Sequence, residues 1–379
     1  MTEPPRPIYL DHNASTPVLP EVREAMLPYL GEHHGNPSSS HPYGRAMRNA
    51  VEKARNQVAA LVDCDPDELY FTSGGTESNN LAIRGLAAAN PERRQIITSV
   101  VEHPATLEPC LRLERHGYTV ERIPVDCTGR VDPAIVSQRI NSQTLLVTIM
   151  HANSETGTLQ PIRELSGIAH VEGALIHTDA AQSLGKVPVS VKREGLDLLS
   201  VAGHKLYAPQ GVGALYVRSG IELEPLLSGA GHEKGLRPGT ENVASIVGLG
   251  QACEIAMRDL ASESRRVCSL RDRLWVKLLH EVEGLELNGH PELRLPNTLN
   301  VRFPGVHGNT LLDHCTTIAA STGSACHESG SAASAVILAM GVDPEEAAGS
   351  VRLTLGRTND IEDIDRAAEA MIRSWQQLS

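Results

Sequence analysis

Reactive side chains stand directly after three apolar runs of this sequence. The three groups are Glu102-His103, Asp179-Ala180-Ala181-Gln182 and Gly203-His204-Lys205. A Lys amine in an enclosed pocket can form a Schiff base with an aldehyde, and an Asp facing a pyridine nitrogen keeps that nitrogen protonated. A His can stack on such a ring, and an amide such as Gln182 can bond its phenolic oxygen. Each residue alone is more often structural, but the set indicates pyridoxal 5′-phosphate as the cofactor.

A glycine-rich turn follows a fourth apolar run. Ser73-Gly74-Gly75-Thr76 comes after the run 68–72 and before a predicted helix. Small residues let backbone N–H groups approach an anion, and a helix N-terminus favours a phosphate. The nucleotide signatures G-x-x-x-x-G-K-[ST] and G-x-G-x-x-G are absent from the sequence. The turn therefore fits the phosphate of the same cofactor, with Thr76 and His204 as contacts.

Parallel strands must position these residues, because ligands bind beyond the carboxyl ends of the strands in open α/β sheets. Apolar runs that predict buried strands alternate with segments of helical period, which is typical of an α/β fold with a mainly parallel sheet. The predicted strands are 68–72, 95–100, 144–150, 174–178, 198–202 and 213–217. Apolar residues spaced by three and four predict a helix over 45–62.

The chain has 379 residues, which is more than one compact core usually holds, and we expect two domains. From about residue 255 the pattern changes to a long charged helix over 258–282. Short strands around 298–303 and 318–320 follow, and then helices to the end. This part predicts a second, smaller domain.

Composition excludes several classes of protein. A formal charge of -12 argues against a main task of holding nucleic-acid phosphates. Seven cysteines without a C-x-x-C pair suggest neither a zinc knuckle nor a disulfide framework, so no metal is expected and the thiols suit a reducing cytosol. The N-terminus lacks the pattern of a signal peptide, and no apolar run reaches about 18 residues. We expect a cytoplasmic protein without a membrane segment.

Several long motifs resemble the cysteine desulfurase family, the NifS/IscS-like group of class V aminotransferase-fold enzymes. They are the segments 72–80, Glu102-His103, 177–182, Gly203-His204-Lys205, 237–242 and Ser324-Ala325-Cys326. The resemblance extends from Tyr9 to Arg357. It implies PLP-dependent conversion of L-cysteine to L-alanine in a homodimer of fold type I. It also implies a large domain, 15–255, with a mainly parallel seven-stranded sheet flanked by helices, and a small α/β domain, 1–14 and 256–379, that carries the catalytic Cys loop.

The resemblance also implies a role for each matching residue. Lys205 would form the Schiff base, Asp179 would face the pyridine nitrogen, and His103 would stack on the ring and assist proton transfers. The remaining positions hold the cofactor or the substrate: Gln182 and Ser154 at the ring oxygen, Gly75, Thr76 and His204 at the phosphate, Thr240 at the phosphate of the other subunit, and Arg357 and Asn36 at the substrate. Arg357 would grip the substrate carboxylate by a bidentate pair.

Cys326 is distinctive without the resemblance, because small polar residues surround it and suit an exposed loop. An exposed thiol fits a nucleophile that attacks the substrate sulfur and keeps it as a persulfide. We expect the other six cysteines to be structural, because free cysteines usually pack as small hydrophobic residues.

Two positions depart from the family pattern: Ser154 replaces the usual Asn, and Ala202 replaces a usual Ser. Ser154 offers a shorter hydroxyl to the ring oxygen, and Ala202 loses a hydroxyl contact to the phosphate. Retention of the cofactor is therefore expected to be weaker. The sulfur acceptor is left open among an iron–sulfur scaffold, tRNA thiolation and DNA phosphorothioation. A selenocysteine lyase, an ordinary aminotransferase and a catalytically weak sulfur-transfer scaffold stay as alternatives.

Overall fold

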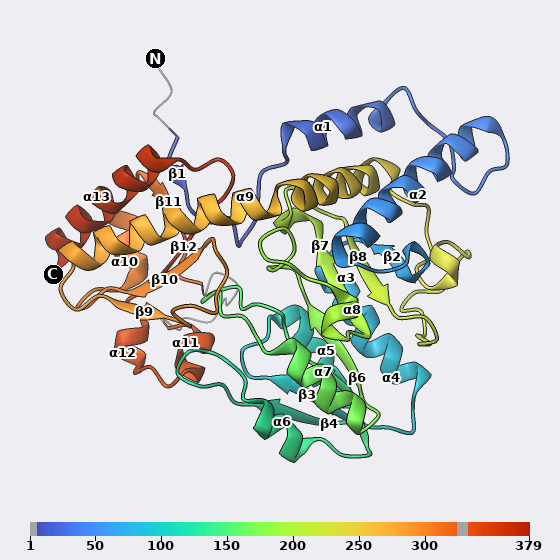
Figure 1. The fold of residues 1–379 in the computed structure, drawn as a ribbon, viewed down its shortest axis with the longest axis horizontal. Helices are drawn as coiled ribbons and strands as arrows, with labels where there is room; N and C mark the ends of the chain where they lie inside the picture. Colours follow the sequence, from blue (N-terminus) through green and yellow to red (C-terminus); the bar gives the residue numbers. More distant parts are fainter. Residues whose placement is uncertain (1–5, 324–332) are drawn as a thin grey trace.

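The computed structural model describes residues 6–323 and 333–379. A large mixed sheet forms one end of the molecule and a smaller sheet the other, and a long helix runs along both (Figure 1). The large sheet has seven strands in the order β2-β8-β7-β6-β5-β3-β4, and β8 runs antiparallel to both of its neighbours. The other neighbouring pairs are parallel. The predicted fold class is confirmed.

The seven strands are short and mostly buried. They are β2 (Leu69–Thr72), β3 (Gln95–Ser99), β4 (Thr119–Ile123), β5 (Thr144–Thr148), β6 (Leu175–Asp179), β7 (Leu198–Ala202) and β8 (Gly213–Val217). Six of them match the predicted apolar runs. The edge strand β4 was not predicted, because its side chains are largely exposed or half-buried and form no apolar run.

Helices cover both faces of this sheet. They are α1 (Pro20–Met26), α2 (Pro42–Val62), α3 (Gly75–Asn80), α4 (Leu86–Ala89), α5 (Pro104–Glu114), α6 (Pro133–Arg139), α7 (Ile162–Val171) and α8 (Val191–Glu194). Successive strand residues point to opposite faces. Thus Ile97 and Leu199 belong to the core shared with α2 and α7, whereas Ile96 and Leu198 belong to the core shared with α4 and α5.

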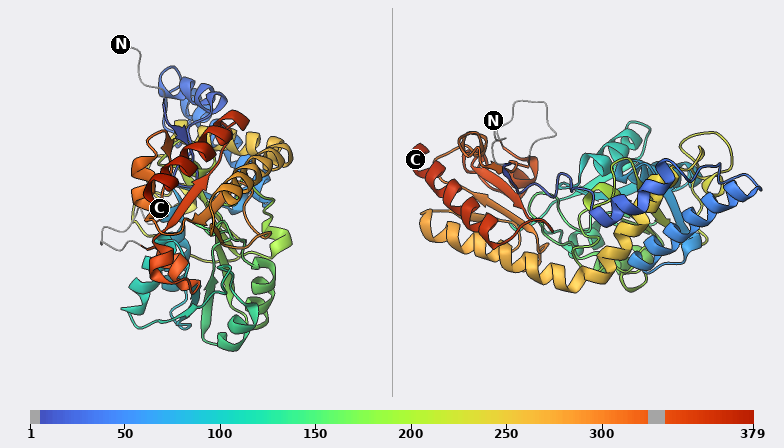
Figure 2. Two further views of the ribbon diagram at one scale, coloured as in Figure 1. Left: turned by 90° about the vertical axis from the view of Figure 1, so that its left-hand side faces the viewer. Right: turned by 90° about the horizontal axis from the view of Figure 1, so that it is seen from above.

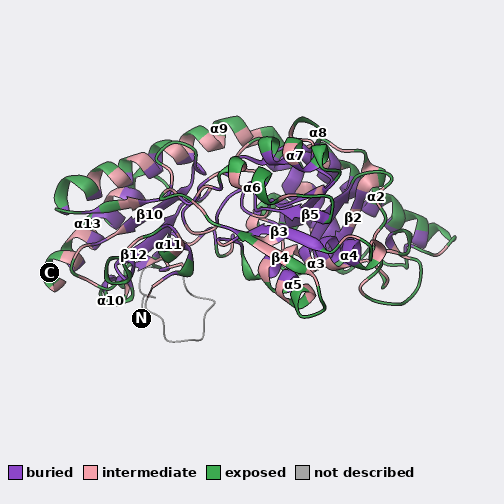
Figure 3. Cartoon of the chain, turned by 90° about the horizontal axis from the view of Figure 1, so that it is seen from below, coloured by how far each residue is buried: buried purple, intermediate pink, exposed green. Residues whose placement is uncertain are grey.

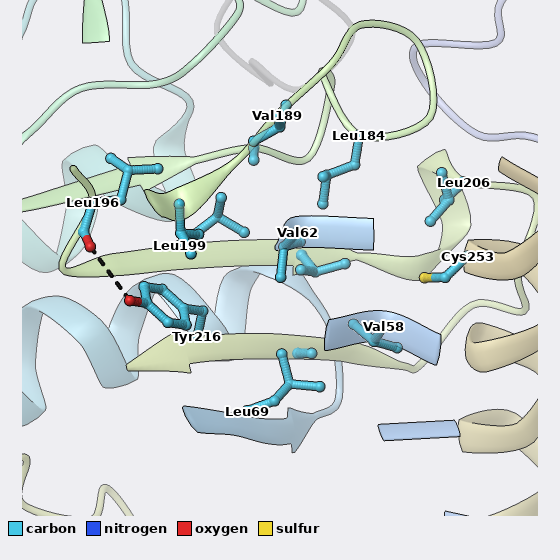
Figure 4. Close-up of a cluster of buried hydrophobic side chains, with 14 of the residues drawn as sticks. Val58, Val62, Leu69, Leu184, Val189, Leu196, Leu199, Leu206, Tyr216 and Cys253 are labelled. Atoms are coloured by element: carbon cyan, nitrogen blue, oxygen red, sulfur yellow. Dashed lines mark hydrogen bonds between the residues drawn. The ribbon is translucent and has the colours of Figure 1, made fainter. Parts of the chain in front are cut away.

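Figure 4 shows part of the first core, where Val58 and Val62 of α2 lie beside Leu199 and Tyr216 of the sheet. The Tyr216 hydroxyl donates to the Leu196 carbonyl at 3.5 Å, so a polar atom in this core keeps a partner. Buried segments fill the sheet interior, and exposed residues follow the outer helix faces (Figure 3). Burial of this apolar surface on both faces stabilises the sheet that carries the reactive residues.

The smaller unit is built on a three-stranded antiparallel sheet of order β12-β10-β9 and a parallel pair, β1 with β11. The N-terminal β1 thus pairs with a strand from the far end of the sequence. The elements are β1 (Ile8–Tyr9), β9 (Glu286–Asn288), β10 (Thr298–Arg302), β11 (Ile318–Ala319), β12 (Ser350–Thr354), α10 (Gly308–His314), α11 (Ala335–Ala339), α12 (Pro344–Ala347) and α13 (Ile361–Leu378).

Helix α9 (Val243–Glu281) joins the two units and begins well before the predicted residue 258. Its first part contributes Ile246 and Leu249 to the core of the large sheet, and its second part contributes Leu274 and Leu278 to that of the small unit. Figure 2 shows the helix along one side of both units. Among the helices of the described residues, none combines the length and apolar character needed to span a bilayer.

Candidate active site

The carboxyl ends of β3, β6 and β7 bring three of the predicted residues into one region. Asp179 ends β6, Lys205 lies in the tight turn 203–205 after β7, and His103 precedes α5 after β3. The charges of Asp179 and Lys205 both act on the His103 ring. The sequence prediction that these side chains share one site agrees with this arrangement.

The Asp179 carboxylate is held from two sides. Asn79 Nδ2 donates to Asp179 Oδ2 at 2.7 Å, and the backbone N–H of Ala181 donates to Oδ1 at 2.9 Å. Asn79 lies in α3 and also donates to Thr106 Oγ1 at 3.1 Å. These two donors fix the orientation of the Asp179 carboxylate, which can then face a cation such as a pyridinium.

The His103 ring caps the helix that follows it. Its Nδ1 accepts from the Ala105 N–H at 3.1 Å, so the neutral ring carries its proton on Nε2. The surrounding protein desolvates the ring and lowers the pKa of His103, against the opposing effect of the Asp179 charge. At neutral pH the ring is therefore an uncharged donor, and it borders an open cavity of about 490 Å³ together with Thr76.

Lys205 contacts the N-terminal segment. Its Nζ donates to the carbonyl oxygens of Asn13 and Ala14, both at 2.6 Å. Gln182 Nε2 donates to the same Asn13 oxygen at 2.9 Å, which brings the two predicted cofactor contacts onto one atom. Gln182 Oε1 in turn accepts from Lys186 Nζ at 2.9 Å.

A cradle for an anion lies at the start of α3. Gly74 has φ +146 and open space where a Cβ would stand, and a Cβ on Gly75 would lie 3.2 Å from the Ala202 Cβ. A serine hydroxyl at position 202 would therefore face this helix start, and Ala202 removes that donor. His204 is adjacent, and burial together with the Lys205 charge lowers the pKa of His204 to about 4. Its neutral ring can still donate to a phosphate.

These residues fit pyridoxal 5′-phosphate as a donor set. An amine, an ordered carboxylate and a glycine-lined helix start lie at neighbouring strand ends, matching the aldehyde, the ring nitrogen and the phosphate of that molecule. Ser154 is half-buried, and its carbonyl accepts from Asn13 Nδ2 at 3.1 Å and Arg352 Nη1 at 3.2 Å. The segment carrying Ser154 is thus tied to the same N-terminal residue as Lys205.

The Arg357 side chain pairs with a carboxylate of α9 in this structure. Its Nη1 lies 2.9 Å from Asp259 Oδ2, and its guanidinium lies 5.8 Å from the Tyr207 ring centre. Arg258 and Arg357 together lower the pKa of Asp259. The Arg357 backbone N–H donates to the Tyr207 hydroxyl at 2.8 Å, which ties this residue to the chain just after Lys205.

Cys326 lies outside the described residues. Gly323, just before that segment, and Ser334, shortly after it, both lie against Glu155. Ser334 Oγ donates to Glu155 Oε2 at 2.5 Å, and a Cβ on Gly323 would lie 2.5 Å from the same oxygen. Burial raises the pKa of Glu155 to about 7, against the effects of Ser334 and Arg352.

Two predicted site residues are exposed and lie apart from this cluster of contacts. Thr240 is exposed on the loop before α9. Asn36 is exposed on the connection 31–41 between α1 and α2, which Figure 2 shows at the extremity of the molecule. Its amide oxygen accepts from the Ser38 N–H at 2.9 Å. The structure thus places these two predicted residues on exposed connections of the chain.

Sequence reasoning missed the residues that hold the predicted site residues in position. Asn13 contacts Lys205, Gln182, Lys186 and a strand of the small sheet, while Asn79 holds Asp179. Asn79 lies in the motif 72–80 that carries the family resemblance, whereas Asn13 lies in none of the quoted motifs. Lys186 follows Gln182 by four residues within the turn after β6, and that spacing was its available signal.

Known proteins resemble this chain over nearly its full length. The model of the aminotransferase class-V family matches residues 8–367. The cysteine desulfurase IscS of Methanosarcina thermophila is 46% identical over 374 residues, which cover 98% of this chain and 92% of that protein. A structure titled NifS-like protein superposes with a TM-score of 0.92 at 36% identity, covering 98% of this chain and 100% of that one. SspA in complex with cysteine has a TM-score of 0.82 at 36% identity, covering 92% and 98%.

Proposed function

The chain belongs to the aminotransferase class-V family and to its cysteine desulfurases, and we propose how its residues carry that reaction. L-Cysteine is converted to L-alanine, and its sulfur is left as a persulfide on Cys326. The observation that carries this proposal is the convergence of Lys205, Asp179 and His103 at neighbouring strand ends, with a glycine-lined helix start beside them.

The residues that would hold pyridoxal phosphate follow from their contacts. Lys205 would form the Schiff base, Asp179 would face the ring nitrogen, and Gln182 would donate to the ring oxygen. The start of α3 with Gly75, Thr76 and His204 would bind the phosphate, and His103 would stack on the ring. When bound, the cofactor withdraws the electron pair left at the substrate α-carbon.

The chain's own groups then handle the proton and the carboxylate. Lys205 Nζ, once free, would take the α proton of the substrate. His103 carries a proton on Nε2 and assists as a donor without adding charge. Arg357 exchanges its pair with Asp259 for the substrate carboxylate, which a guanidinium binds in two parallel hydrogen bonds.

The Cys326 thiolate takes the sulfur. An S–S bond forms, the Cβ–S bond of L-cysteine breaks, and the sulfur loses two electrons to the β-carbon, which becomes the methyl group of L-alanine. The thiol proton of Cys326 is balanced by the new methyl hydrogen, so no external oxidant is needed. Transfer of the persulfide to an acceptor returns the thiol.

The exposed positions of Thr240 and Asn36 support a homodimer in which each site is completed from the other copy. In that assembly Thr240 would contact the partner's cofactor phosphate, and Asn36 would line a substrate site. We also propose that each copy has a large domain, 15–255, and a small domain, 1–14 and 256–379. The separate cores on either side of Ala256 in α9 support this division.

We propose that the sulfur acceptor is a protein of one of three pathways: an iron–sulfur scaffold, tRNA thiolation or DNA phosphorothioation. The six described cysteines are free thiols, which supports the reducing compartment that such transfer needs and a cytoplasmic location. Selenocysteine lyase is the second candidate, because Ala202 stands where desulfurases usually have Ser.

The test measures sulfide and L-alanine together, from L-cysteine with a thiol reductant and added pyridoxal phosphate. Equal amounts of both products are expected, and Lys205→Ala and Cys326→Ser should abolish sulfide release. L-Selenocysteine in a parallel reaction tests the lyase. Failure to form L-alanine from either substrate would overturn the proposal.

A further inference from the structure

Lys186 is a half-buried cation, and both of its hydrogen-bond acceptors are neutral. Its Nζ donates to Gln182 Oε1 at 2.9 Å and lies 3.4 Å from Asn13 Oδ1, and both acceptors are amide oxygens. Among the described residues, no carboxylate lies within ion-pair distance of this ammonium. Arg352, in contrast, has its own partner, Asp11, at 2.7 Å.

The charges around Lys186 have the same sign as its own. Burial, the charge of Lys205 and that of Arg352 lower the pKa of Lys186 to about 7. Two basic rings also face it: the Lys186 charge contributes to the lowered pKa of His12 and of His204. A desolvated cation among cations and amide dipoles is unfavourable unless an anion joins the group. Such an anion would raise the pKa of Lys186 and keep it protonated.

Gln182 determines where that anion would lie. Because Gln182 Oε1 accepts from Lys186 Nζ, the NH₂ group of the amide points away from Lys186. Its Nε2 donates to the Asn13 carbonyl at 2.9 Å. That carbonyl also accepts from Lys205 Nζ at 2.6 Å. An amide NH₂ has two hydrogens, and the Asn13 oxygen uses one. The second can donate to an anionic oxygen held beside Lys205.

We propose that Lys186 is a positioning residue, which fixes the Gln182 amide toward the ring oxygen of pyridoxal phosphate and supplies a positive charge behind it. This inference rests on the proposed function, because the ring oxygen is present when the cofactor is bound at Lys205. Lys186 contacts neither the substrate nor the reacting atoms. Its effect is to favour the ionised ring oxygen through one amide.

The proposal predicts a spectroscopic change. A nearby positive charge makes a neighbouring protonated nitrogen more acidic, and removing the charge reverses that effect. The cofactor's visible absorbance band changes when one proton dissociates. Without Lys186 this proton should be held more tightly, so the pKa of the band should rise. One charge at a separation of two hydrogen-bonded groups corresponds to an upward shift of about one pH unit at an effective dielectric constant of about 20 to 40.

The experiment titrates that band from low to high pH in the substrate-free holoenzyme. Lys186→Met removes charge and donor, Lys186→Gln keeps a polar end without charge, and Lys186→Arg keeps the charge. Upward shifts of about one unit are expected for Met and Gln, and a value near that of the unchanged protein for Arg. Lys192→Met is the control, because Lys192 is exposed and pairs with Asp63 at 3.4 Å.

Two outcomes separate this inference from the proposed function. If the visible band exists and Lys205→Ala abolishes it, but neither uncharged Lys186 variant shifts its titration, Lys186 has no such role. If the unchanged protein with added pyridoxal phosphate gives no band that depends on Lys205, the proposed function fails first. Thermal unfolding of the cofactor-free variants checks that each is folded. If Lys186→Met does not fold, the comparison of Lys186→Gln with Lys186→Arg still decides the question.

Discussion

Lys205 Nζ lies 2.6 Å from the carbonyl oxygen of Asn13, although 192 positions separate the two residues in the chain. Asn13 also donates through Nδ2 to Thr298 Oγ1 at 2.9 Å, on a strand of the small sheet. The reactive lysine of the large sheet is thus held by a residue anchored in the other unit. Both units therefore determine where the amine lies.

We expect Asn13→Ala to lower the free energy of unfolding by about 2 to 3 kcal/mol, because it leaves Asn297 and Thr298 with fewer buried partners. The backbone oxygen that holds Lys205 remains, so the cofactor's visible band should persist. Urea unfolding of the cofactor-free protein measures the loss. Asn56→Ala, at an exposed amide, should change stability by less than about 0.5 kcal/mol, and equal losses would contradict the role of Asn13.

Glu102 gives a pH dependence of stability. Burial raises the pKa of Glu102 to about 8, whereas an unfolded Glu titrates near 4.3. The folded protein therefore binds the extra proton between these values, and stability falls as pH rises through this window. Glu102→Gln keeps the acceptor oxygen for Ser99 and Met150 and removes this loss.

The stability of Glu102→Gln relative to the unchanged protein should increase by about 3.5 kcal/mol between pH 5 and pH 8. Unfolding midpoints at both pH values measure the difference. Glu108→Gln, at an exposed position on α5, serves as the control. A difference that is constant with pH would show that Glu102 is ionised in the folded protein.

In the proposed function, Arg357 exchanges its pair with Asp259 for the substrate carboxylate. We expect Asp259→Asn to lower KM for L-cysteine about two- to fivefold with little change in kcat, because an ion pair of this exposure contributes up to about 1 kcal/mol. Initial rates over a range of cysteine concentrations give both constants. Asp365→Asn breaks a comparable pair with Arg273 and should leave KM unchanged. A raised KM in Asp259→Asn would mean that Asp259 orients Arg357 for the substrate.

Ala202→Ser should restore a phosphate contact. A hydroxyl at this position faces the start of α3, and one hydrogen bond there contributes about 0.5 to 1.5 kcal/mol. The dissociation constant of pyridoxal phosphate should fall by a factor of about two to twelve. Equilibrium titration of the cofactor-free protein measures it. Ala208→Ser, at a buried position outside the cradle, should not tighten binding.

The sequence predicted most of the large sheet because its central strands are buried on both faces and form continuous apolar runs. Strand β4 was not predicted because it lies at the sheet edge. Strand β12 was not predicted because it contains Arg352, whose charge pairs with Asp11. The start of α9 was not predicted because residues 243–257 pack against other elements on several sides and show no charged face. Lys205, Asp179 and His103 were predictable from their strand-end positions, and Lys186 could have been noted from its spacing to Gln182. Asn13 acts through contacts with residues far away in the chain, which spacing does not reveal.

The most direct test of the account is a single turnover with one equivalent of L-cysteine and no reductant, followed by mass analysis of the peptides that carry Cys326 and Cys127. The account predicts one added sulfur atom on the Cys326 peptide, one equivalent of L-alanine, and loss of both in Lys205→Ala. Sulfur on the exposed Cys127 instead, or L-alanine formed at the same yield by Cys326→Ser, would contradict it.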